Sequence, residues 1–417
     1  MRKWLLAPVL ALLLTVCLYA AAWAGEPIDC GDYQYELQED GTATIVNYMG
    51  DAKELTLPAA LDGHPVTKLD AWAFLFDDKV QTLTIPDGVT VVDPEAFEEC
   101  TGLREIVVSA AHPTLSVVDG VLFDKTGTEL LAYPAGRSDD RYEVPRGTRV
   151  IGEEAFAFAV HLTEVVVPDG VTAIGAGAFR RCAALQHIAL PDSVAAIGYS
   201  AFNGCGALTE VTIPAGVAEM GAALFEHCTA LERVWLLNEP ATLPDFTFFG
   251  CTGLRTYDIP DSVSVIGRNA FAQCTGLEEI VVPESVVALD NMAFGGCTAL
   301  KKVVLSSRLM YLGSSVFSEC AALEEITLPE GLYRIEAGTF TGCKSLKQLT
   351  VPTQIFEIGR YAFIGCTALE RVTMPGYPQY YAETFANCPV LTLEVVAGMS
   401  WQAEEMGIPY TVIESVY

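Results

Sequence analysis

A period of 23 residues constrains this chain more than any other feature of its sequence. Ten phenylalanines and nine cysteines each recur at that interval. The phenylalanines are Phe156, Phe179, Phe202, Phe225, Phe248, Phe271, Phe294, Phe317, Phe340 and Phe363. The cysteines are Cys182, Cys205, Cys228, Cys251, Cys274, Cys297, Cys320, Cys343 and Cys366. A fixed period of about 20–50 residues is the signature of a solenoid, in which every repeat forms one coil.

One repeat illustrates the local structure that we expect. The alternation of Tyr257 and Ile259 predicts a strand, and Pro260 predicts its end because proline has no N–H to donate to a sheet. Farther along the same repeat, Phe271 and Cys274 have the spacing of a single helical or 3₁₀ turn that buries one side. Each repeat therefore consists of a strand, a corner, a short return segment and a tight turn.

A single repeat cannot fold alone. Its large apolar side chains contribute about 10–15 kcal/mol when they are buried, whereas ordering its backbone costs about 1–2 kcal/mol for each residue, which is a larger total. Stacking covers both open faces of a coil and pairs each strand with the next at about 4.8 Å. We therefore expect a repeat solenoid built around a parallel β-sheet.

The residues of the repeat resemble those of a known family. The pattern Leu-x-x-Val-x-Ile-Pro-x-x-Val-x-x-Ile-Gly-x-x-Ala-Phe-x-x-Cys is represented in one coil by residues 208–214, Val217, Gly221, Phe225 and Cys228. It resembles the BspA-like leucine-rich repeats of secreted and surface bacterial proteins. The resemblance implies a right-handed leucine-rich-repeat coil, with the parallel sheet on the concave face and with short return strands and 3₁₀ or helical turns on the convex side.

The first residues have the pattern of a secretory signal peptide. An apolar run over residues 4–19 follows a basic start, and the small residues Ala22 and Ala24 predict cleavage after Ala24. A competing interpretation is lipid modification at Cys17. No second run of about 20 apolar residues follows. We expect a secreted, extracellular protein that can associate with the cell surface and that does not insert into the membrane after signal cleavage.

Breaks in the period divide the chain. The turn dipeptide at 40–41 predicts a hairpin, the interval of 59 residues between Phe97 and Phe156 marks an insertion, and residues 400–406 predict a short helix before a strand over 410–412. The expected segments are a signal peptide (1–24), an N-terminal β-hairpin cap (25–65), the first leucine-rich repeats (66–109), a β-hairpin insertion (110–145), a run of 23-residue leucine-rich repeats (146–388) and a C-terminal cap (389–417).

The cysteines favour a ladder of free thiols. Stacking would place equivalent cysteines about 5 Å apart, which is within disulfide range, but with parallel side chains that point into the core. Buried cysteines behave as small apolar residues, and a straight row does not converge into a tetrahedral zinc site. Cys30 and Cys388 lie outside the main run, and the sequence leaves their pairing open.

Charge and motifs exclude several classes of function. The chain has 53 acidic and 24 basic residues, a net charge of -29, which disfavours nucleic acids and anionic membrane surfaces as partners. The five histidines include no His-Glu-x-x-His string, and no Gly-x-Ser-x-Gly elbow or Walker loop is present. We therefore expect no catalytic residues, no cofactor and no metal, so that the protein is not an enzyme.

One outward position stands out as a candidate ligand site. Trp235 is expected to face solvent between the inward Val234 and Leu236, in the least regular repeat of the run. A tryptophan beside arginine and acidic groups suits sugar stacking or a protein hot spot. The alternative is that Trp235 fills a gap left by its irregular coil. The candidate patch consists of His187, Glu210, Thr212, Arg233, Trp235 and Asp258.

The expected function is binding. The resemblance implies an adhesin-like protein that recognises extracellular or host proteins, with glycans as a second class of partner, and the extended sheet face suits macromolecular partners. Two alternatives remain: a structural surface or scaffold protein without a dedicated ligand, and a glycan-binding module. We expect a monomer.

Overall fold

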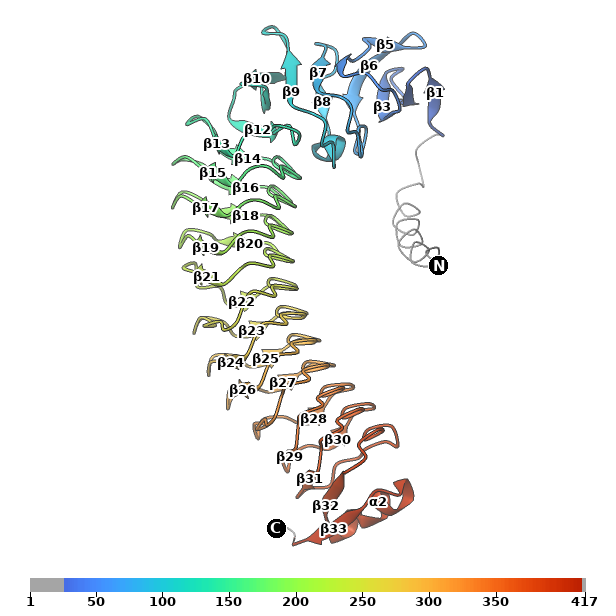
Figure 1. Cartoon of the computed structure of the whole chain (residues 1–417), viewed down its shortest axis with the longest axis vertical. Helices are drawn as coiled ribbons and strands as arrows, with labels where there is room; N and C mark the ends of the chain where they lie inside the picture. Colours follow the sequence, from blue (N-terminus) through green and yellow to red (C-terminus); the bar gives the residue numbers. More distant parts are fainter. Residues whose placement is uncertain (1–25, 415–417) are drawn as a thin grey trace.

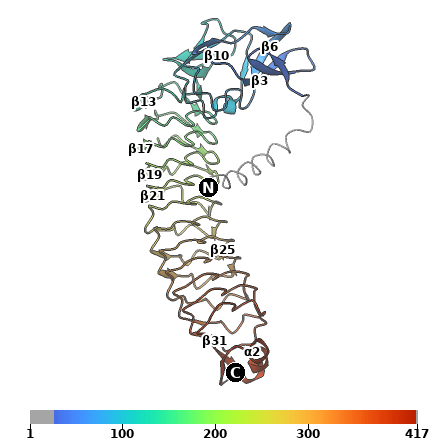
Figure 2. The ribbon, with the colours of Figure 1, turned by 45° about the vertical axis from the view of Figure 1, so that its right-hand side comes forward.

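The structure is a computed structural model that describes residues 26–414. Figure 1 shows a long, curved stack of coils, with helix α2 (Ser400–Met406) at its C-terminal end. The strands from β1 to β9 (residues 28–108) form a part that we call the N-terminal block, and this block is set at an angle to the remaining coils. Figure 2 shows the same stack from a second side. The expected signal peptide lies outside the described residues. The repeat solenoid with parallel strands that the period of 23 predicts is confirmed.

Each coil contributes its first strand to a ladder that we call the first ladder. Neighbouring strands in it are parallel, and equivalent residues of consecutive repeats lie opposite each other, as Glu210 and Arg233 do. The strands are β4 (Glu54–Thr56), β7 (Thr82–Ile85), β9 (Glu105–Val108), β13 (Arg141–Glu143), β15 (Glu164–Val166), β17 (His187–Ala189), β19 (Glu210–Ile213), β21 (Arg233–Leu236), β24 (Glu279–Val281), β26 (Lys302–Val304), β29 (Gln348–Thr350), β31 (Arg371–Met374), β32 (Thr392–Val396) and β33 (Tyr410–Ile413).

The return segments form parallel ladders of their own, together called the return ladder. In β16 and β18, for example, Ala173 lies opposite Ala196. The strands are β6 (His64–Leu69), β8 (Val91–Val92), β12 (Glu129–Ala132), β14 (Val150–Ile151), β16 (Ala173–Ile174), β18 (Ala196–Ile197), β20 (Glu219–Met220), β22 (Thr242–Leu243), β23 (Val265–Ile266), β25 (Ala288–Leu289), β27 (Tyr311–Leu312), β28 (Arg334–Ile335) and β30 (Glu357–Ile358). The return ladder is interrupted between β8 and β12, between β20 and β22 and between β27 and β28.

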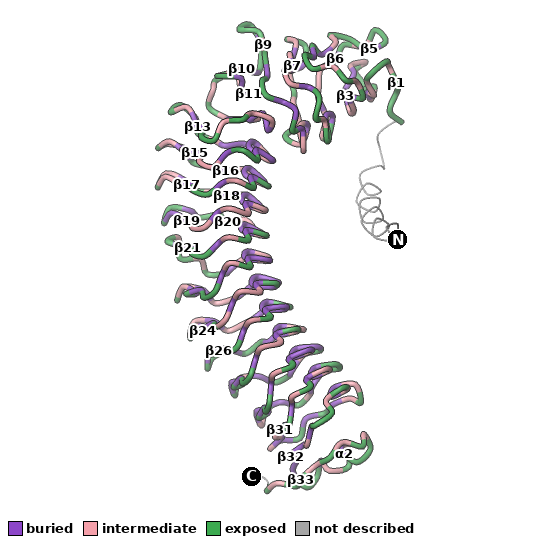
Figure 3. Tube along the Cα trace, viewed as in Figure 1, coloured by how far each residue is buried: buried purple, intermediate pink, exposed green. Residues whose placement is uncertain are grey.

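The repeated phenylalanines form a stacked column in the core. From Phe156 to Phe385 the rings of consecutive coils lie 5.1–5.8 Å apart, centroid to centroid. The ten phenylalanines at intervals of 23 residues are fully buried, and buried residues recur at the same place in successive coils (Figure 3). Offset-stacked aromatic pairs add to the apolar burial that each coil gains from its neighbours.

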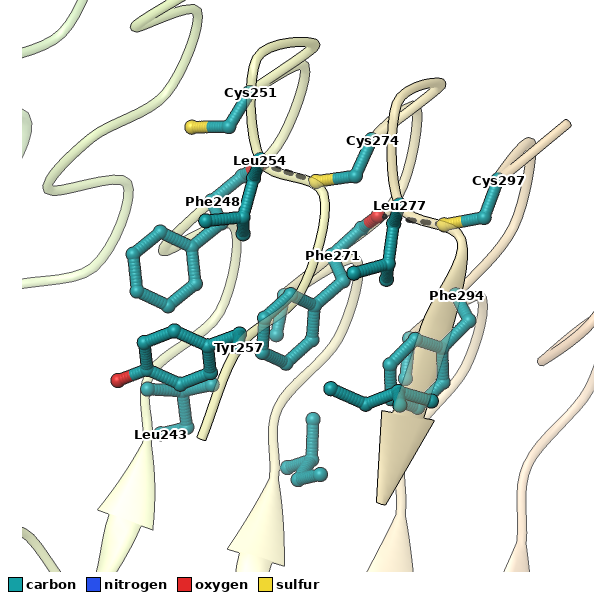
Figure 4. Packing of buried hydrophobic residues seen from close by; sticks show 14 of the residues in the cluster. Leu243, Phe248, Cys251, Leu254, Tyr257, Phe271, Cys274, Leu277, Phe294 and Cys297 are labelled. Atoms are coloured by element: carbon teal, nitrogen blue, oxygen red, sulfur yellow. Dashed lines mark hydrogen bonds between the residues drawn. The ribbon is translucent and has the colours of Figure 1, made fainter. Parts of the chain in front are cut away.

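The repeated cysteines are free thiols that donate hydrogen bonds from coil to coil. Cys274 Sγ donates to the carbonyl oxygen of Phe248 at 3.0 Å, and Cys297 Sγ donates to that of Phe271 at 3.1 Å (Figure 4). All twelve cysteines within residues 26–414 are unpaired, Cys30 included. In the same part of the chain, no group of three or more His, Cys, Asp or Glu side chains is arranged to hold a metal ion.

The turn around each phenylalanine is more extended than a single 3₁₀ turn. The Cys274 N–H does donate to the Phe271 carbonyl in the expected i+3 pattern, but Asn269 and Gln273 have φ angles of 54° and 61°. Because right-handed and left-handed residues alternate, alternate N–H groups point along the stack. Phe271 N, for example, donates to Ala293 O in the next coil at 2.8 Å. The turns therefore form a third hydrogen-bonded wall.

Antiparallel strands occupy the N-terminal end and the insertion. Strands β1 (Ile28–Cys30), β2 (Tyr33–Leu37) and β3 (Ala43–Tyr48) form a meander, and β5 (Ala60–Leu61) forms a hairpin with β6. In the insertion, β10 (Leu115–Val118), β11 (Val121–Asp124) and β12 form a second antiparallel sheet. The 3₁₀ helix η1 (Pro94–Phe97) lies in the N-terminal block.

The C-terminal end matches the expectation from sequence. The 3₁₀ helix η2 (Ala397–Met399) leads into α2, and β33 follows, as the pattern of residues 400–412 predicts. Gly407, with φ of 67°, ends the helix in the left-handed conformation that favours glycine. Within residues 26–414, no helix has the length and apolarity that crossing a bilayer requires.

The first ladder is interrupted, and one expected strand is absent. Tyr257 and Ile259 belong to no strand; the repeat joins the ladder only through a bridge between Asp258 and Val281. In the preceding repeat, the Leu237 N–H donates to Ile213 O at 3.0 Å. Leu237 thus continues the pairing of β21 with the coil before it, at the position where other repeats have proline. Similar gaps separate β17 from β19 and the repeat at 325–330 from β29.

Candidate functional site

Trp235 lies at an outward position of β21. Its side chain is 45% exposed, whereas Val234 and Leu236 on either side of it are buried in the core. This alternation follows from the pleat of a strand that packs one face against the solenoid core. The indole therefore presents a large, half-exposed aromatic surface on the outward face of the first ladder.

The strands bring most of the predicted patch together. Thr212 lies directly opposite Trp235, and Glu210 lies opposite Arg233. Arg233 Nη2 contacts Glu210 Oε2 at 2.8 Å, and Nε contacts the same oxygen at 3.3 Å. This contact raises the pKa of the Arg233 guanidinium, so the side chain stays charged. The ion pair holds Arg233 over the neighbouring strand.

Two shallow hollows flank the indole. The first, of about 320 Å³, is lined by His187, Glu210, Thr212 and Trp235, and we call it the His187 hollow. The second, of about 410 Å³, is lined by Arg233, Trp235 and Asp258, and we call it the Asp258 hollow. All six residues of the predicted patch line one hollow or the other. Trp235 is the side chain that both hollows share.

The hollows coincide with the gaps in the first ladder. Strands β17 and β19 are not hydrogen-bonded neighbours, and the His187 hollow lies between them. β21 has no paired strand on its other side, and the Asp258 hollow lies there. A third hollow of about 410 Å³, lined in part by Glu325, Gln348 and Arg371, lies at another such gap. Local separation of coils therefore opens concave places on a face that would otherwise be flat.

The chemistry of the patch suits binding. It offers an aromatic face, a hydroxyl, an imidazole, and carboxylates at Glu210 and Asp258, around two open depressions. Interfaces draw most of their affinity from tryptophan, tyrosine and arginine anchors that a partner can cover. The arrangement can therefore stack on a flat group and accept hydrogen bonds on both sides of it.

The sequence interpretation missed a second group of exposed side chains, on the return ladder. Met310, Tyr333 and Phe356 occupy the same position of three consecutive repeats and are 61%, 61% and 55% exposed. Tyr311, beside Met310, is also exposed. We call these four residues the aromatic stripe. Their spacing of 23 residues was a usable signal, since three large apolar residues recur at a position that is alanine in three earlier repeats.

Comparison with known proteins identifies a family model that matches most of the chain. The model of the BspA type leucine-rich repeat region matches six copies, over residues 52–133, 149–278 and 265–392. No curated protein matches the chain in sequence.

Solved structures of similar proteins cover almost the full length. A leucine-rich cell surface protein from Faecalibacterium prausnitzii is 28% identical, with 88% of this chain and 99% of that chain covered and a TM-score of 0.53. A leucine-rich repeat protein from Bacteroides ovatus is 23% identical over 93% and 100% of the two chains, with a TM-score of 0.58. The pneumococcal vaccine antigen PcpA is 17% identical over 94% and 99%, with a TM-score of 0.58. The last two likenesses concern the fold alone.

Proposed function

Because the chain belongs to the BspA-type leucine-rich repeat family, we propose that it is an exported binding protein of the cell surface or its surroundings. Proteins of this architecture present an extended face to macromolecular partners. The Faecalibacterium prausnitzii relative is described as a cell surface protein, which supports the same location here. The proposed partners are extracellular or host proteins, in an adhesin-like role.

The observation that supports a dedicated site best is the place of Trp235 between two hollows. An indole that only filled a gap in its coil would be covered, yet this side chain is 45% exposed and forms a wall of both depressions. A partner loop that covered it would bury a large apolar surface at the centre of the contact, where hot spots concentrate. Arg233 and Glu210 would then lie at the polar edge of the same contact.

The proposal is tested by binding assays on the protein without residues 1–24. Immobilised extracellular-matrix and host-surface proteins, and a panel of glycans, are probed with wild type, Trp235→Ala and Arg233→Ala. Trp401→Ala is the matched control, because Trp401 is also an exposed tryptophan but lies on α2. We expect Trp235→Ala to weaken protein binding at least about tenfold, the loss of a hot spot, and the control to bind as wild type does.

Each other outcome selects a different function. Binding to glycans alone, lost in Trp235→Ala, would favour a glycan-binding module. Binding that all variants retain would exclude the patch as the site. Absence of binding to every probe would favour a structural surface or scaffold protein. The circular dichroism spectrum of each variant should match that of wild type.

A further inference from the structure

The aromatic stripe distinguishes the C-terminal third of the solenoid from the coils before it. The equivalent positions of three earlier repeats carry the small residues Ala195, Ala218 and Ala241, and the repeat directly before Met310 carries Val287. Tyr333 and Phe356 lie on directly adjacent coils, since Phe356 N donates to Tyr333 O at 3.0 Å. Met310 and Tyr311 lie on the preceding coil, across a gap between β27 and β28, which are not hydrogen-bonded to each other. A group of large exposed apolar side chains on a protein surface is a mark of an interaction site. The stripe lies on the return ladder, not on the first ladder that carries Trp235.

Carboxylates surround the stripe. Asp290 directly follows Leu289, which pairs with Leu312 beside Tyr311, and burial and, after it, the charges of Asp290 and Glu336 raise the pKa of Tyr311. At the other end, Glu357 Oε1 accepts a hydrogen bond from Tyr381 Oη at 2.8 Å. The whole chain carries a net charge of -29. A surface of rings edged by carboxylates in an acidic protein attracts cations and repels anions.

Two arginines of the protein itself show how a cation sits on this face. The Arg334 guanidinium lies 5.7 Å from the centre of the Phe356 ring while Nη2 contacts Glu357 at 2.9 Å. The Arg360 guanidinium lies 5.1 Å from the centre of the Tyr381 ring. Each cation thus has an aromatic face and a carboxylate together, which is the environment that favours cation–π contact.

The remaining rings of the stripe offer the same environment without a cation. Within residues 26–414, no arginine or lysine of the chain lies over Tyr311 or Tyr333. Arg334 contacts Glu357 at 2.9 Å and Glu336 at 3.7 Å, whereas Asp290 has no ion-pair partner among residues 26–414. The charge and the ring surface are therefore both available at the Met310 end of the stripe.

We propose that the aromatic stripe is a second binding surface, which takes a basic, arginine-rich segment of a partner protein. Arginine side chains of the partner stack on Tyr311 and Tyr333 and pair with Asp290, and aliphatic parts of the same segment cover Met310. Arginine is favoured over lysine because its planar guanidinium stacks on a ring and contacts a carboxylate at the same time. This proposal is independent of the function proposed for Trp235.

The test uses the protein without residues 1–24 and a fluorescent peptide of alternating arginine and serine. Fluorescence anisotropy measures its affinity for wild type, for Tyr311→Ser/Tyr333→Ser, and for Tyr199→Ser/Trp401→Ser. The last variant removes two exposed aromatic residues elsewhere. Neither double variant changes the net charge, so general attraction to an acidic protein is the same in all three. We expect about a tenfold loss of affinity in the stripe variant only, and weaker binding of the lysine version of the peptide.

A second measurement needs no variant and so does not depend on the folding of one. Hydrogen exchange of the wild-type protein should slow at residues 309–312 and 333–336 when the arginine peptide is added, and not at residues 195–197. Equal affinity of all variants, or protection spread evenly over the solenoid, would overturn the proposal. So would stripe-dependent binding of a neutral serine-glycine peptide, of a glycan, or of phosphatidylcholine vesicles in place of the arginine peptide. Trp235→Ala should leave peptide binding unchanged, which separates this result from the test of the first site.

Discussion

The cysteine of each repeat combines two roles that no other small residue combines. The Phe248 carbonyl oxygen accepts from Cys251 N of its own coil at 3.1 Å and from Cys274 Sγ of the next coil at 3.0 Å. The thiol is apolar enough for complete burial and is still a weak donor. It therefore satisfies the second lone pair of a buried carbonyl without bringing a strongly polar group into the core. The period of the cysteines reflects packing and hydrogen bonding.

The first prediction concerns thiol reactivity. Burial raises the pKa of Cys274 to about 12, so the folded protein holds a protonated, enclosed thiol. A protonated thiol reacts slowly with alkylating agents, because the thiolate is the nucleophile. At about pH 8, we expect iodoacetamide to modify the partly exposed Cys30 slowly in the native protein, because its hydrogen bond to Asp62 raises the pKa of that thiol, and to modify Cys274 only after unfolding in guanidinium chloride. Mass spectrometry of tryptic peptides measures both. Rapid labelling of Cys274 in the native protein would contradict the enclosed column, and a disulfide-linked peptide would contradict the free thiols.

At the residue scale the sequence predicted the packing and missed the partner of the thiol. The interval of 23 residues placed Phe271 and Cys274 in the core, because a position that stays apolar throughout the run of repeats faces inward in a stack. The acceptor of the Cys274 thiol is the carbonyl of Phe248, 26 residues earlier. That contact depends on how far one turn rises over the next, which side-chain patterns do not encode.

At the scale of the element, the turn around each phenylalanine requires left-handed residues at fixed positions. Gly250, Gln273 and Gly296 are equivalent, with φ of 71°, 61° and 76°. Glycine adopts this conformation readily, whereas a residue with a Cβ is strained by about 1 kcal/mol. The alternation of right-handed and left-handed residues directs N–H groups toward the next coil, as for Phe271 and Ala293. The hydrogen bonds between the turns of consecutive coils therefore depend on a left-handed conformation that is unfavourable for most residues other than glycine.

The second prediction follows from that strain. Gln273→Gly should raise the free energy of unfolding by about 0.5–1 kcal/mol, because it relieves a left-handed glutamine and leaves the hydrogen bond from residue 273 N to Gly295 O intact. Gly250→Ala is the matched change in the opposite direction: a Cβ there would lie 2.6 Å from His227 Nδ1, at φ of 71°. Gly250→Ala should lower the free energy of unfolding by about 1–2 kcal/mol. Urea unfolding followed by circular dichroism measures both, and a loss of stability in Gln273→Gly would show that the glutamine side chain outweighs the strain.

The sequence predicted the secondary-structure elements that depend on the pattern of their own residues. It did not predict correctly the elements that depend on pairing with neighbouring coils. The helix over 400–406 and the following strand were predicted from the sequence. The strand at Tyr257 and Ile259 was wrong, because alternation shows that a segment can pair but not that a partner lies in register. The same limit applies to the candidate site. The outward position of Trp235 was predicted from alternation, whereas the two hollows arise from gaps in the ladder that leave the period of 23 unchanged.

At the scale of the whole molecule, the insertion separates two hydrophobic cores. Along β11, Val121 and Phe123 pack into the core of the main solenoid, whereas Leu122 packs into the core of the N-terminal block. The strand thus uses its two faces for two cores, as alternating side chains allow. The insertion therefore forms the joint at which the N-terminal block is set at an angle to the remaining coils (Figure 1).

An ion cluster ties the two parts together across this joint. Arg180 Nη2, from the main solenoid, lies 3.0 Å from Glu98 Oε1 of the N-terminal block and 3.0 Å from Glu154 Oε2. Glu98 also accepts a hydrogen bond from Trp72 Nε1 at 2.7 Å. Glu95 is a further carboxylate of this cluster, and burial with the charge of Glu98 raises its pKa. One guanidinium therefore faces three carboxylates, so the cluster carries excess negative charge.

The third prediction is a pH dependence at this joint. Burial raises the pKa of Glu154 from 4.5 to about 7, against the opposing effect of Arg180. Between these two values the unfolded chain loses the Glu154 proton while the folded chain keeps it, so the free energy of unfolding falls as pH rises through this window, by at most about 3 kcal/mol from this group. Glu154→Gln removes the titration and keeps an oxygen that can accept from Arg180. The variant should gain stability relative to wild type between about pH 5 and pH 8.

Urea unfolding at both pH values measures the difference, and Glu153→Gln is the matched control, because Glu153 is exposed beside Glu154. A gain confined to Glu154→Gln would show that the desolvation of the carboxylate outweighs its ion pair with Arg180. If Glu154→Gln instead lost stability at the higher pH, the ion pair would be the stronger effect and the joint would tighten, not loosen, as pH rises. The two outcomes give changes in the free energy of unfolding of opposite sign. The measurement therefore decides whether the excess carboxylates or the ion pair with Arg180 has the larger effect on the stability of this joint.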